Sequence, residues 1–252
     1  MMNLIHSAKA NIKQHKPIIL CLTNYVTMDF MANSLLALGA APIMSCDDTE
    51  LEELINISHA INLNMGTLDG AFISRCQTAV KIAQQNNKPI ILDPVGAGAS
   101  HIRTQSAKTL MPFADIIRGN ASEIMALADM QTQTAGVEST QTTHMAKESA
   151  DLLAKQLHNT VIVSGKEDYV TDGQRQETLQ FGSSLMPFIT GMGCTLTAVV
   201  AAFRAIQADS YDAARFATAF FGLCGNIAEQ KAKAPGSFRT AFIDALYTEV
   251  SI

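Results

Sequence analysis

Several features that mark particular protein classes are missing from this sequence of 252 residues. It has no dense run of lysine or arginine, and its formal net charge is -5, which argues against nucleic-acid binding. No apolar run reaches the roughly 20 residues of a membrane-spanning helix. Residues 1–15 lack the long apolar core of a signal peptide. We therefore expect a cytoplasmic protein that binds neither nucleic acid nor membrane.

Cysteine and histidine are present but show no metal-binding spacing. The five cysteines lie far apart, at positions 21, 46, 76, 194 and 224, and no pair has the CxxC spacing. An odd number of scattered cysteines suits a reducing compartment and carries no zinc signature. The six histidines are also dispersed, so we expect no histidine–cysteine metal cluster.

Short apolar runs alternate with helix-compatible segments along most of the chain. The expected strands are 17–22, 41–46, 60–65, 88–92, 115–117 and 160–164, followed by a strand–turn–strand segment at 170–181. The main expected helices are 1–14, 28–38, 69–86, 106–111, 145–157, 193–206, 211–232 and 239–250. This alternation indicates a three-layer αβα fold with a mostly parallel central sheet. Because no linker or repeat is visible, we predict a single domain over residues 1–252.

Four segments between these elements lead to expectations of their own. Residues 47–49 (Asp-Asp-Thr) should cap the helix that follows them. His101 should lie in a solvated loop after the glycine-rich segment. Residues 131–143, rich in Gln, Thr, Ser and Gly, should form a mobile loop. Residues 235–238 (Pro-Gly-Ser-Phe) should interrupt the last helices as a turn or as a contact to the ligand.

Polar residues gather where the predicted parallel strands end. These clusters are Thr23-Asn24, Met44-Ser45, Gly66-Thr67, Asp93, residues 118–123 and Ser164-Gly165. Ligands of open α/β sheets bind beyond the carboxyl ends of the strands. The shared placement of the clusters predicts a binding site at this edge of the sheet.

Two glycines stand directly before a late apolar helix, in the run Gly191-Met192-Gly193-Cys194. Glycine allows backbone N–H groups to crowd together, and a helix start adds unpaired donors and a positive dipole end. Together they suit an anion, phosphate above all. The same field should favour a thiolate at Cys194. A glycine turn that merely starts a packed helix explains the run equally well.

Charged and amide side chains near this edge also have two interpretations. Asp93 follows a buried strand and suits either a hydrated magnesium ion or a turn cap. Asn120 and Glu123, three residues apart, suit either an outer-sphere magnesium and phosphate contact or a capping pair. Arg118 suits either a bidentate phosphate contact or an ordinary surface position.

Two of these strand ends carry further candidate contact residues. Met44 lies at one of them and Asn24, with its amide donors and acceptor, at another. Methionine-bearing apolar strand ends suit a small aromatic substrate better than a polyhydroxylated sugar. Asn24 also suits a plain turn position.

The order and spacing of eight motifs resemble the hydroxyethylthiazole kinases of the ribokinase-like superfamily. The motifs are TNYVTMD (23–29), GAAPIMS (39–45), LNMGTL (63–68), ILDPVGAGAS (91–100), IRGNASEI (117–124), VSGKEDYVTDG (163–173), TGMGCTLTAVV (190–200) and PGSFRTAFIDAL (235–246). Related kinases of the superfamily carry aspartate where this chain has Cys194. The cysteine is similar to that of the thiazole kinases.

The resemblance implies ATP-dependent phosphorylation of the alcohol of 4-methyl-5-(2-hydroxyethyl)thiazole, for thiamine formation. Mg²⁺ is the implied cofactor, and a homotrimer with the thiazole site between subunits is the implied assembly. The implied ATP contacts are Arg118 and Ser164, to which the residue patterns above add Asn120 and Gly193. The implied substrate contacts are Asn24, Met44, Gly66, Thr67 and Gly191. The implied magnesium region is Asp93 and Glu123.

The role of Cys194 and three rival functions stay open at the level of sequence. Cys194 is the candidate catalytic residue, either as the base for the hydroxyl proton or as a group that positions the alcohol. The rivals are another small-molecule kinase of this fold, a nucleotide-dependent lyase, and a nucleotide-binding regulator without turnover. The first two should carry aspartate at Cys194, and the third would need no catalytic group.

Overall fold

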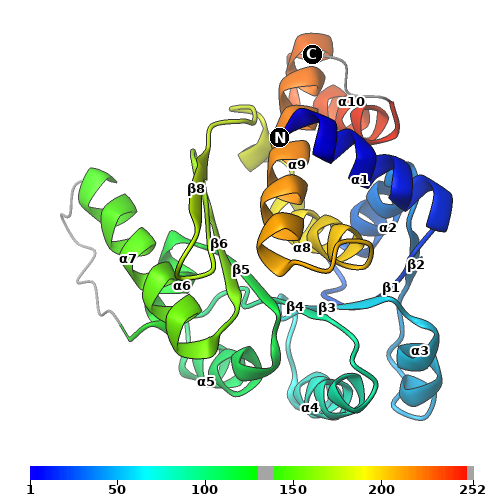
Figure 1. Ribbon diagram of the computed structural model, residues 1–252, viewed down its shortest axis with the longest axis vertical. Coiled ribbons are helices and arrows are strands. Elements are labelled where there is room, and N and C mark those ends of the chain that lie inside the picture. Colours follow the sequence, from blue (N-terminus) through cyan, green and yellow to red (C-terminus); the bar gives the residue numbers. More distant parts are fainter. Residues whose placement is uncertain (130–138, 249–252) are drawn as a thin grey trace.

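One mixed sheet of eight strands runs through the protein in the order β2-β1-β3-β4-β5-β6-β7-β8 (Figure 1). The computed structural model describes residues 1–129 and 139–248. The strands β1 to β6 pair in parallel, and β7 and β8 complete one edge as an antiparallel hairpin. The predicted three-layer, mostly parallel architecture is therefore confirmed.

The elements follow the predicted alternation. The strands are β1 Ile18–Leu22, β2 Ala41–Ile43, β3 Ala60–Asn64, β4 Ile90–Asp93, β5 Ile116–Asn120, β6 Thr160–Ser164, β7 Asp168–Thr171 and β8 Gln176–Leu179. The helices are α1 Met2–His15, α2 Met28–Leu38, α3 Leu51–Ile57, α4 Gly70–Gln85, α5 His101–Leu110, α6 Ala121–Leu127, α7 Ser139–Leu157, α8 Met192–Arg204, α9 Ser210–Lys231 and α10 Pro235–Tyr247. Single 3-10 turns occur at Met111–Phe113 and Met186–Phe188.

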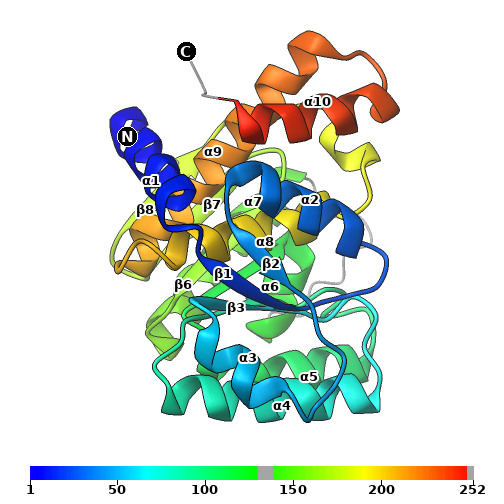
Figure 2. The same cartoon turned by 90° about the vertical axis from the view of Figure 1, so that its right-hand side faces the viewer.

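Two hydrophobic clusters hold the layers together, one on each face of the sheet. One cluster joins α1, α2, α8, α9 and α10 to the sheet, and the other lies beneath α3, α4, α5, α6 and α7. The first group of helices lies above the strands and α3, α4 and α5 lie below them (Figure 2). Side chains of a strand alternate between faces, so Ile19 and Cys21 of β1 join the first cluster and Leu20 and Leu22 the second. Both faces are buried, which explains the continuous apolar strands of the sequence.

Three local expectations are wrong, each at the start of a helix. The first turn of α3 has Glu50 as its N-cap with no side-chain bond, and Asp47 instead accepts a hydrogen bond from the N–H of Thr49. His101 is exposed but begins α5, whose N-cap is Ser100. Pro235 begins α10, where the lack of an N–H group costs nothing because an N–H at the first helical position has no partner within the helix.

Two further differences concern element bounds. Strand β2 ends at Ile43, so Met44, Ser45 and Cys46 lie beyond it. Helix α7 begins at Ser139, which places the last part of the expected loop 131–143 in a helix. The remainder of that expectation, residues 131–138, lies outside the described residues.

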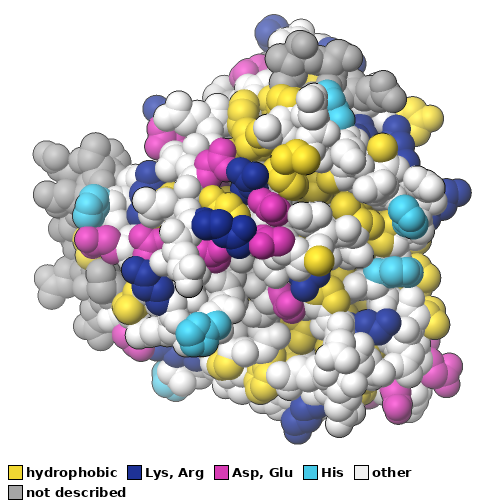
Figure 3. Space-filling view, in the orientation of Figure 1, with side chains coloured by type: hydrophobic (Ala, Val, Ile, Leu, Met, Phe, Trp, Pro, Cys, Tyr) yellow, Lys and Arg dark blue, Asp and Glu magenta, His cyan; other side chains and the backbone are white. Residues whose placement is uncertain are grey.

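Charged side chains of opposite sign are intermixed on the face shown in Figure 3. Arg175 pairs with Asp172 and Asp209, and Arg215 pairs with Asp212 and Glu177. These cations are therefore neutralised locally by carboxylates. Within the described ranges 1–129 and 139–248, no helix is long and apolar enough to cross a membrane.

Candidate active site

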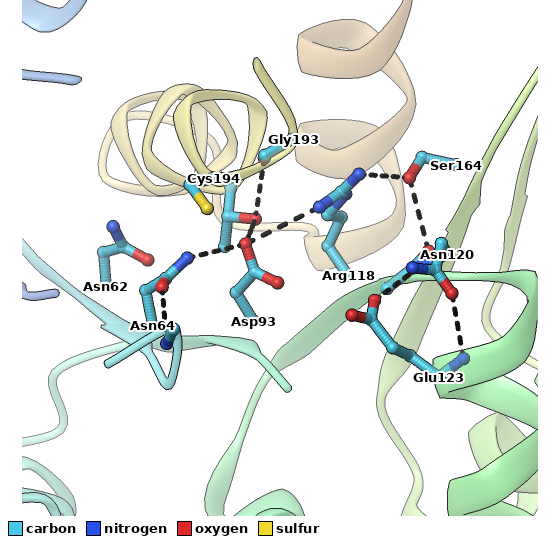
Figure 4. Close-up of polar contacts among 12 residues, drawn as sticks. Asn62, Asn64, Asp93, Arg118, Asn120, Glu123, Ser164, Gly193 and Cys194 are labelled. Atoms are coloured by element: carbon cyan, nitrogen blue, oxygen red, sulfur yellow. Dashed lines mark hydrogen bonds and ion pairs between the residues drawn. The ribbon is translucent and has the colours of Figure 1, made fainter. Parts of the chain in front are cut away.

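The predicted clusters at Asp93, residues 118–123 and Ser164 meet at the carboxyl edge of the sheet, around the start of α8 (Figure 4). At the centre is Asp93, the last residue of β4, which is fully buried. Its Oδ2 accepts hydrogen bonds from Asn64 Nδ2 and Thr197 Oγ1, both at 2.8 Å. Arg118 Nη1 lies 3.6 Å from the same oxygen, and Oδ1 has no hydrogen-bond partner among the described residues. A buried carboxylate thus keeps one oxygen unused.

Burial dominates the electrostatics of Asp93. It raises the pKa of that carboxyl to about 6, although the Arg118 guanidinium, Thr197 and Asn64 all favour the charged form. The negative charge of Glu123 adds to the rise. Asp93 is therefore ionised at neutral pH. Its buried charge costs desolvation free energy, which a bound cation would offset.

Arg118 connects the central carboxylate to the neighbouring strand. It lies in β5, and its Nη2 donates a hydrogen bond to Ser164 Oγ at the end of β6. A Cβ on Gly193 would lie 2.6 Å from Nη1 of Arg118. The guanidinium therefore lies directly against the backbone of α8, and only glycine leaves room for it.

The first turn of α8 has the properties of an anion-binding site. Gly191 is its N-cap with φ +87°, a conformation that suits glycine, and a Cβ there would lie 2.7 Å from Thr27 Cγ2. The N–H of Met192 donates to Ile189 O, and that of Thr195 donates to Gly191 O. Among the described residues no backbone acceptor takes the N–H groups of Gly193 and Cys194. Two donors at the positive end of the helix are thus available to an anion.

The expected thiolate at Cys194 is wrong. Burial raises the pKa of the Cys194 thiol above its usual value, and the negative charge of Asp93 adds to the rise. Hydrogen bonds from Asn64 and Asn24 and the charge of Arg118 act in the opposite direction but do not prevail. The sequence shows the helix start but not the burial and the neighbouring carboxylate, and these two effects favour the protonated thiol.

Asn120 and Glu123 form the capping box that the sequence left as one of two interpretations. Asn120 Oδ1 accepts from the N–H of Glu123, and Glu123 Oε2 accepts from the N–H of Asn120 at 2.8 Å. The other carboxylate oxygen, Oε1, accepts from the N–H of Gly96 at 2.9 Å. The cap holds the Glu123 carboxylate in place and nearly buried, close enough to Asp93 to affect its pKa.

A cavity of about 1010 Å³ opens beside this cluster. Arg118, Asn120, Ser164 and Gly193, the four predicted ATP contacts, all lie in its wall. Apolar side chains line another part, namely Phe181, Met186, Pro187, Met192, Leu196 and Phe221. The cavity therefore combines polar and cationic groups of the kind that bind phosphate with an apolar surface suited to a flat ring.

Asn24, one of the predicted substrate contacts, lies beside Cys194. Asn24 Nδ2 is 3.5 Å from Cys194 Sγ, and a Cβ on Gly66 would lie 2.7 Å from the Asn24 side chain. Thr67 Oγ1 accepts from the N–H of Tyr25 at 3.2 Å. Met44 is half-buried and packs against the first hydrophobic cluster. Asn24, Gly66 and Thr67 form one group, whereas no described hydrogen bond or ion pair joins Met44 to it.

Sequence reasoning missed Asn64 and Thr197. Asn64 ends β3 and Thr197 lies one turn into α8, and both side chains are fully buried against Asp93. The available signal for Asn64 was a polar residue inside the apolar strand AINLN. For Thr197 it was the one-turn spacing from Gly193.

The chain is similar to known proteins over nearly its whole length. The hydroxyethylthiazole kinase family model matches residues 10–251. The hydroxyethylthiazole kinase of Chlamydia caviae is 48% identical over 249 residues, which cover 98% of this chain and 95% of that protein. The structure of the hydroxyethylthiazole kinase protein from Pyrococcus horikoshii has a TM-score of 0.90 at 36% identity, covering 98% of this chain and 93% of that one.

A more distant structure supports the fold alone. A ribokinase-like superfamily protein from Enterococcus faecalis has a TM-score of 0.65 at 12% identity and covers 98% of this chain and 94% of its own. The predicted ribokinase-like fold is thereby confirmed. With a family model that spans nearly all of the chain, and relatives at this identity over nearly their whole length, this chain belongs to the hydroxyethylthiazole kinase family.

Proposed function

We propose that this protein transfers the γ-phosphoryl group of ATP to the hydroxyl of 4-methyl-5-(2-hydroxyethyl)thiazole, in the formation of thiamine. One observation carries the proposal. The cavity that holds Arg118 and Ser164 reaches the amides at the start of α8, and Cys194 of that turn lies beside the Asn24 group. A phosphate donor and a small alcohol bound on the two sides of this turn would meet there.

The nucleotide would bind in the cavity. Arg118 would meet phosphate oxygens through its forked donors, and the hydroxyl of Ser164 would add one donor. Asn120 lies beside them, and the amide of Gly193 contributes the helix-end field. The base would lie against the apolar wall that includes Phe181 and Phe221.

The residues present fit a hydrated Mg²⁺ ion. Asp93 Oδ1 is buried without a partner, and both Asp93 and Glu123 supply the hard oxygen atoms that this ion prefers. Glu123 already accepts two backbone N–H groups, so its contact would pass through the ion's water shell. When bound, the ion neutralises phosphate charge. Within residues 1–129 and 139–248 no cluster of three His, Cys, Asp or Glu offers an all-protein metal cage.

The thiazole alcohol would lie on the Asn24 side of Cys194. The backbone of Gly66 approaches closely because a side chain there would meet Asn24. Thr67, Gly191 and Met44 would complete the contacts, with the methionine supplying polarisable apolar surface. The ring fits this side better than a sugar, which would need many more hydrogen-bond partners.

In the mechanism that we propose, the protein acts mainly by positioning the reactants. The amides of Gly193 and Cys194 would stabilise the negative charge on the transferring group, together with Arg118. Phosphoryl transfer through a loose transition state needs little help from a base. Since the pKa of Cys194 is raised, we assign it the role of orienting the alcohol as a neutral thiol.

We further propose that residues 1–252 act as one domain and assemble as a homotrimer with the thiazole site between subunits. Support comes from Tyr25 and Val26, which directly follow Asn24 and are 62% and 67% exposed. Apolar side chains exposed beside an incomplete site suit burial by a second copy. Light scattering should report three chains per particle. The five free cysteines also agree with a cytoplasmic location.

The decisive test is ADP formation from ATP and Mg²⁺ with and without the thiazole alcohol. We expect ADP release to depend on the alcohol, and a nucleotide-binding regulator would release none. A competition assay with a hydroxymethylpyrimidine and a sugar separates the rival kinases. Preference for either competitor would overturn the proposed substrate.

A further inference from the structure

Strand β3 carries two buried asparagines in an otherwise apolar run. Asn62 and Asn64 are both 0% exposed and lie on the face of the sheet that packs against α8. Burying an amide costs free energy unless its donors and acceptor are used. The two asparagines differ in how many of these groups are paired, and Asn64 is the one whose amide is held on both sides.

The amide of Asn64 is held from both sides. Its Nδ2 donates to Asp93 Oδ2 at 2.8 Å. Its Oδ1 accepts from Asn24 Nδ2 at 2.7 Å and from the N–H of Gly66 at 3.1 Å. No other residue among those described bonds to both the buried carboxylate and the Asn24 group.

These bonds determine which way each amide points. An ionised carboxylate only accepts hydrogen bonds, so the Nδ2 of Asn64 must face Asp93 and its Oδ1 must face away. That oxygen in turn requires a donor, so Asn24 must turn its Nδ2 toward it. The same Nδ2 lies 3.5 Å from Cys194 Sγ. The orientation of Asn24 beside the thiol is therefore set by Asp93, through Asn64.

We propose that Asn64 is a positioning residue for the phosphoryl acceptor, which holds the Asn24 amide in a single orientation toward Cys194 and the alcohol. The inference rests on the proposed function, since it concerns the alcohol side of that site. Without Asn64, the Asn24 amide loses its buried acceptor and can present either its oxygen or its nitrogen to the substrate. The alcohol should then bind more weakly even when Asn24 itself is intact.

Asn62 supplies a matched control. It lies in the same strand, on the same face, with the same burial, and two residues before Asn64. Its described hydrogen bond is from Nδ2 to Met31 Sδ at 3.4 Å, and its Oδ1 has no partner among the described residues. Asn62→Ala therefore reproduces the loss of a buried amide without touching Asp93 or Asn24.

The test is a double-mutant cycle on binding of the thiazole alcohol, measured by calorimetry without nucleotide or metal. Asn64→Ala and Asn24→Ala should each raise the Kd about tenfold. The double variant should show little further loss of affinity, because both substitutions disrupt the same hydrogen-bonded pair of amides. Asn62→Ala should stay within about twofold of the unchanged protein. Thermal unfolding of each variant shows that it is folded. Asn64→Ser, which keeps a small polar group at that position, replaces Asn64→Ala if the latter does not fold, with the same expectations.

The inference is overturned if the two single effects multiply in the double variant, or if Asn62→Ala weakens binding as much as Asn64→Ala. An unchanged Kd in Asn64→Ala also overturns it. Alcohol-dependent ADP release by the unchanged protein separates this failure from failure of the proposed function. If that release is present and the cycle is multiplicative, only the role of Asn64 is lost.

Discussion

At the proposed nucleotide end of the site, Arg118 and Ser164 face a cavity of about 1010 Å³, whereas at the proposed alcohol end Asn24 and Asn64 are almost wholly buried. The first end is open, charged and lined by side chains of several strands and helices. The second end is a chain of hydrogen-bonded amides next to the exposed Tyr25 and Val26. The described chain thus forms the cavity of the proposed nucleotide end by itself, while the apolar side chains exposed at the proposed alcohol end fit completion of the site by a second subunit, as in the proposed trimer.

The contrast indicates how each end achieves its task. A flexible triphosphate is met by charged donors that a wide cavity leaves accessible. A small alcohol has few groups to recognise, so its orientation depends on neighbours that cannot move. A substitution at one end should therefore change the KM for one substrate and leave the KM for the other nearly unchanged.

The largest effect should come from Asp93, which both ends share. Asp93→Asn keeps the shape but removes the charge, and we expect kcat to fall by about 10²–10³-fold. ADP release measured with saturating ATP, Mg²⁺ and alcohol tests this. Asp115→Asn is the control, because Asp115 lies at the opposite edge of the sheet, where it accepts from the N–H of Ile90. Near-normal turnover in Asp93→Asn would remove that carboxylate from the mechanism.

Gly193→Ala should break the nucleotide end alone. The new Cβ would lie 2.6 Å from Arg118 Nη1, and the guanidinium can move only by weakening its contacts to Asp93 and Ser164. We expect the KM for ATP to rise about 10- to 100-fold. The KM for the alcohol should change little. Gly70→Ala is the matched control, since a Cβ there meets nothing within 4 Å. An equal rise in both KM values would contradict the separation.

Gly66→Ala should break the alcohol end alone. The added Cβ would lie 2.7 Å from the Asn24 side chain, which has no space to withdraw because it is 3% exposed. We expect the KM for the alcohol to rise about tenfold, as overpacking in a buried site costs on the order of 1–3 kcal/mol. The KM for ATP is the internal reference. A variant that loses affinity for ATP instead would show that the two ends are not separate.

The smallest effect should come from Cys194→Ser. The raised pKa keeps the thiol protonated through neutral pH, so a thiolate base would make kcat rise tenfold per pH unit up to that pKa. We expect no such slope between about pH 6 and 8 in the unchanged protein, and a kcat for Cys194→Ser within about tenfold of it. Cys46→Ser, at an exposed cysteine, is the control. A tenfold slope that vanishes in Cys194→Ser would establish the base role.

Much of the fold could be predicted because strand burial leaves a strong trace in sequence. The predicted and observed bounds agree for β6 at 160–164 and for α2 at 28–38, whose end is marked by Gly39 in the left-handed region. The starts of α5 and α10 were harder to predict. Ser100 and Pro235 read as loop residues in isolation, and only the following turn shows that they begin helices.

The sequence predicted where the site lies better than it predicted which side chains interact there. Parallel strands bring their carboxyl ends to one edge, so Asp93, Arg118 and Ser164 could be grouped before any contact was known. Asn64 could not be assigned a partner, because a buried amide in a strand has the same local pattern whether it bonds to a carboxylate or, like Asn62, to a methionine.

The sequence by itself determined the alternation of strands and helices, the edge at which polar residues gather, and the glycines at the start of α8. Each of these depends on neighbours within a few residues, through side-chain period, chain direction and backbone freedom. Only the tertiary structure decided the charge state of Cys194 and the orientation of Asn24. Both depend on burial beside Asp93, a residue about 100 positions from the thiol in the chain, and electrostatic energies depend on distance and desolvation in space.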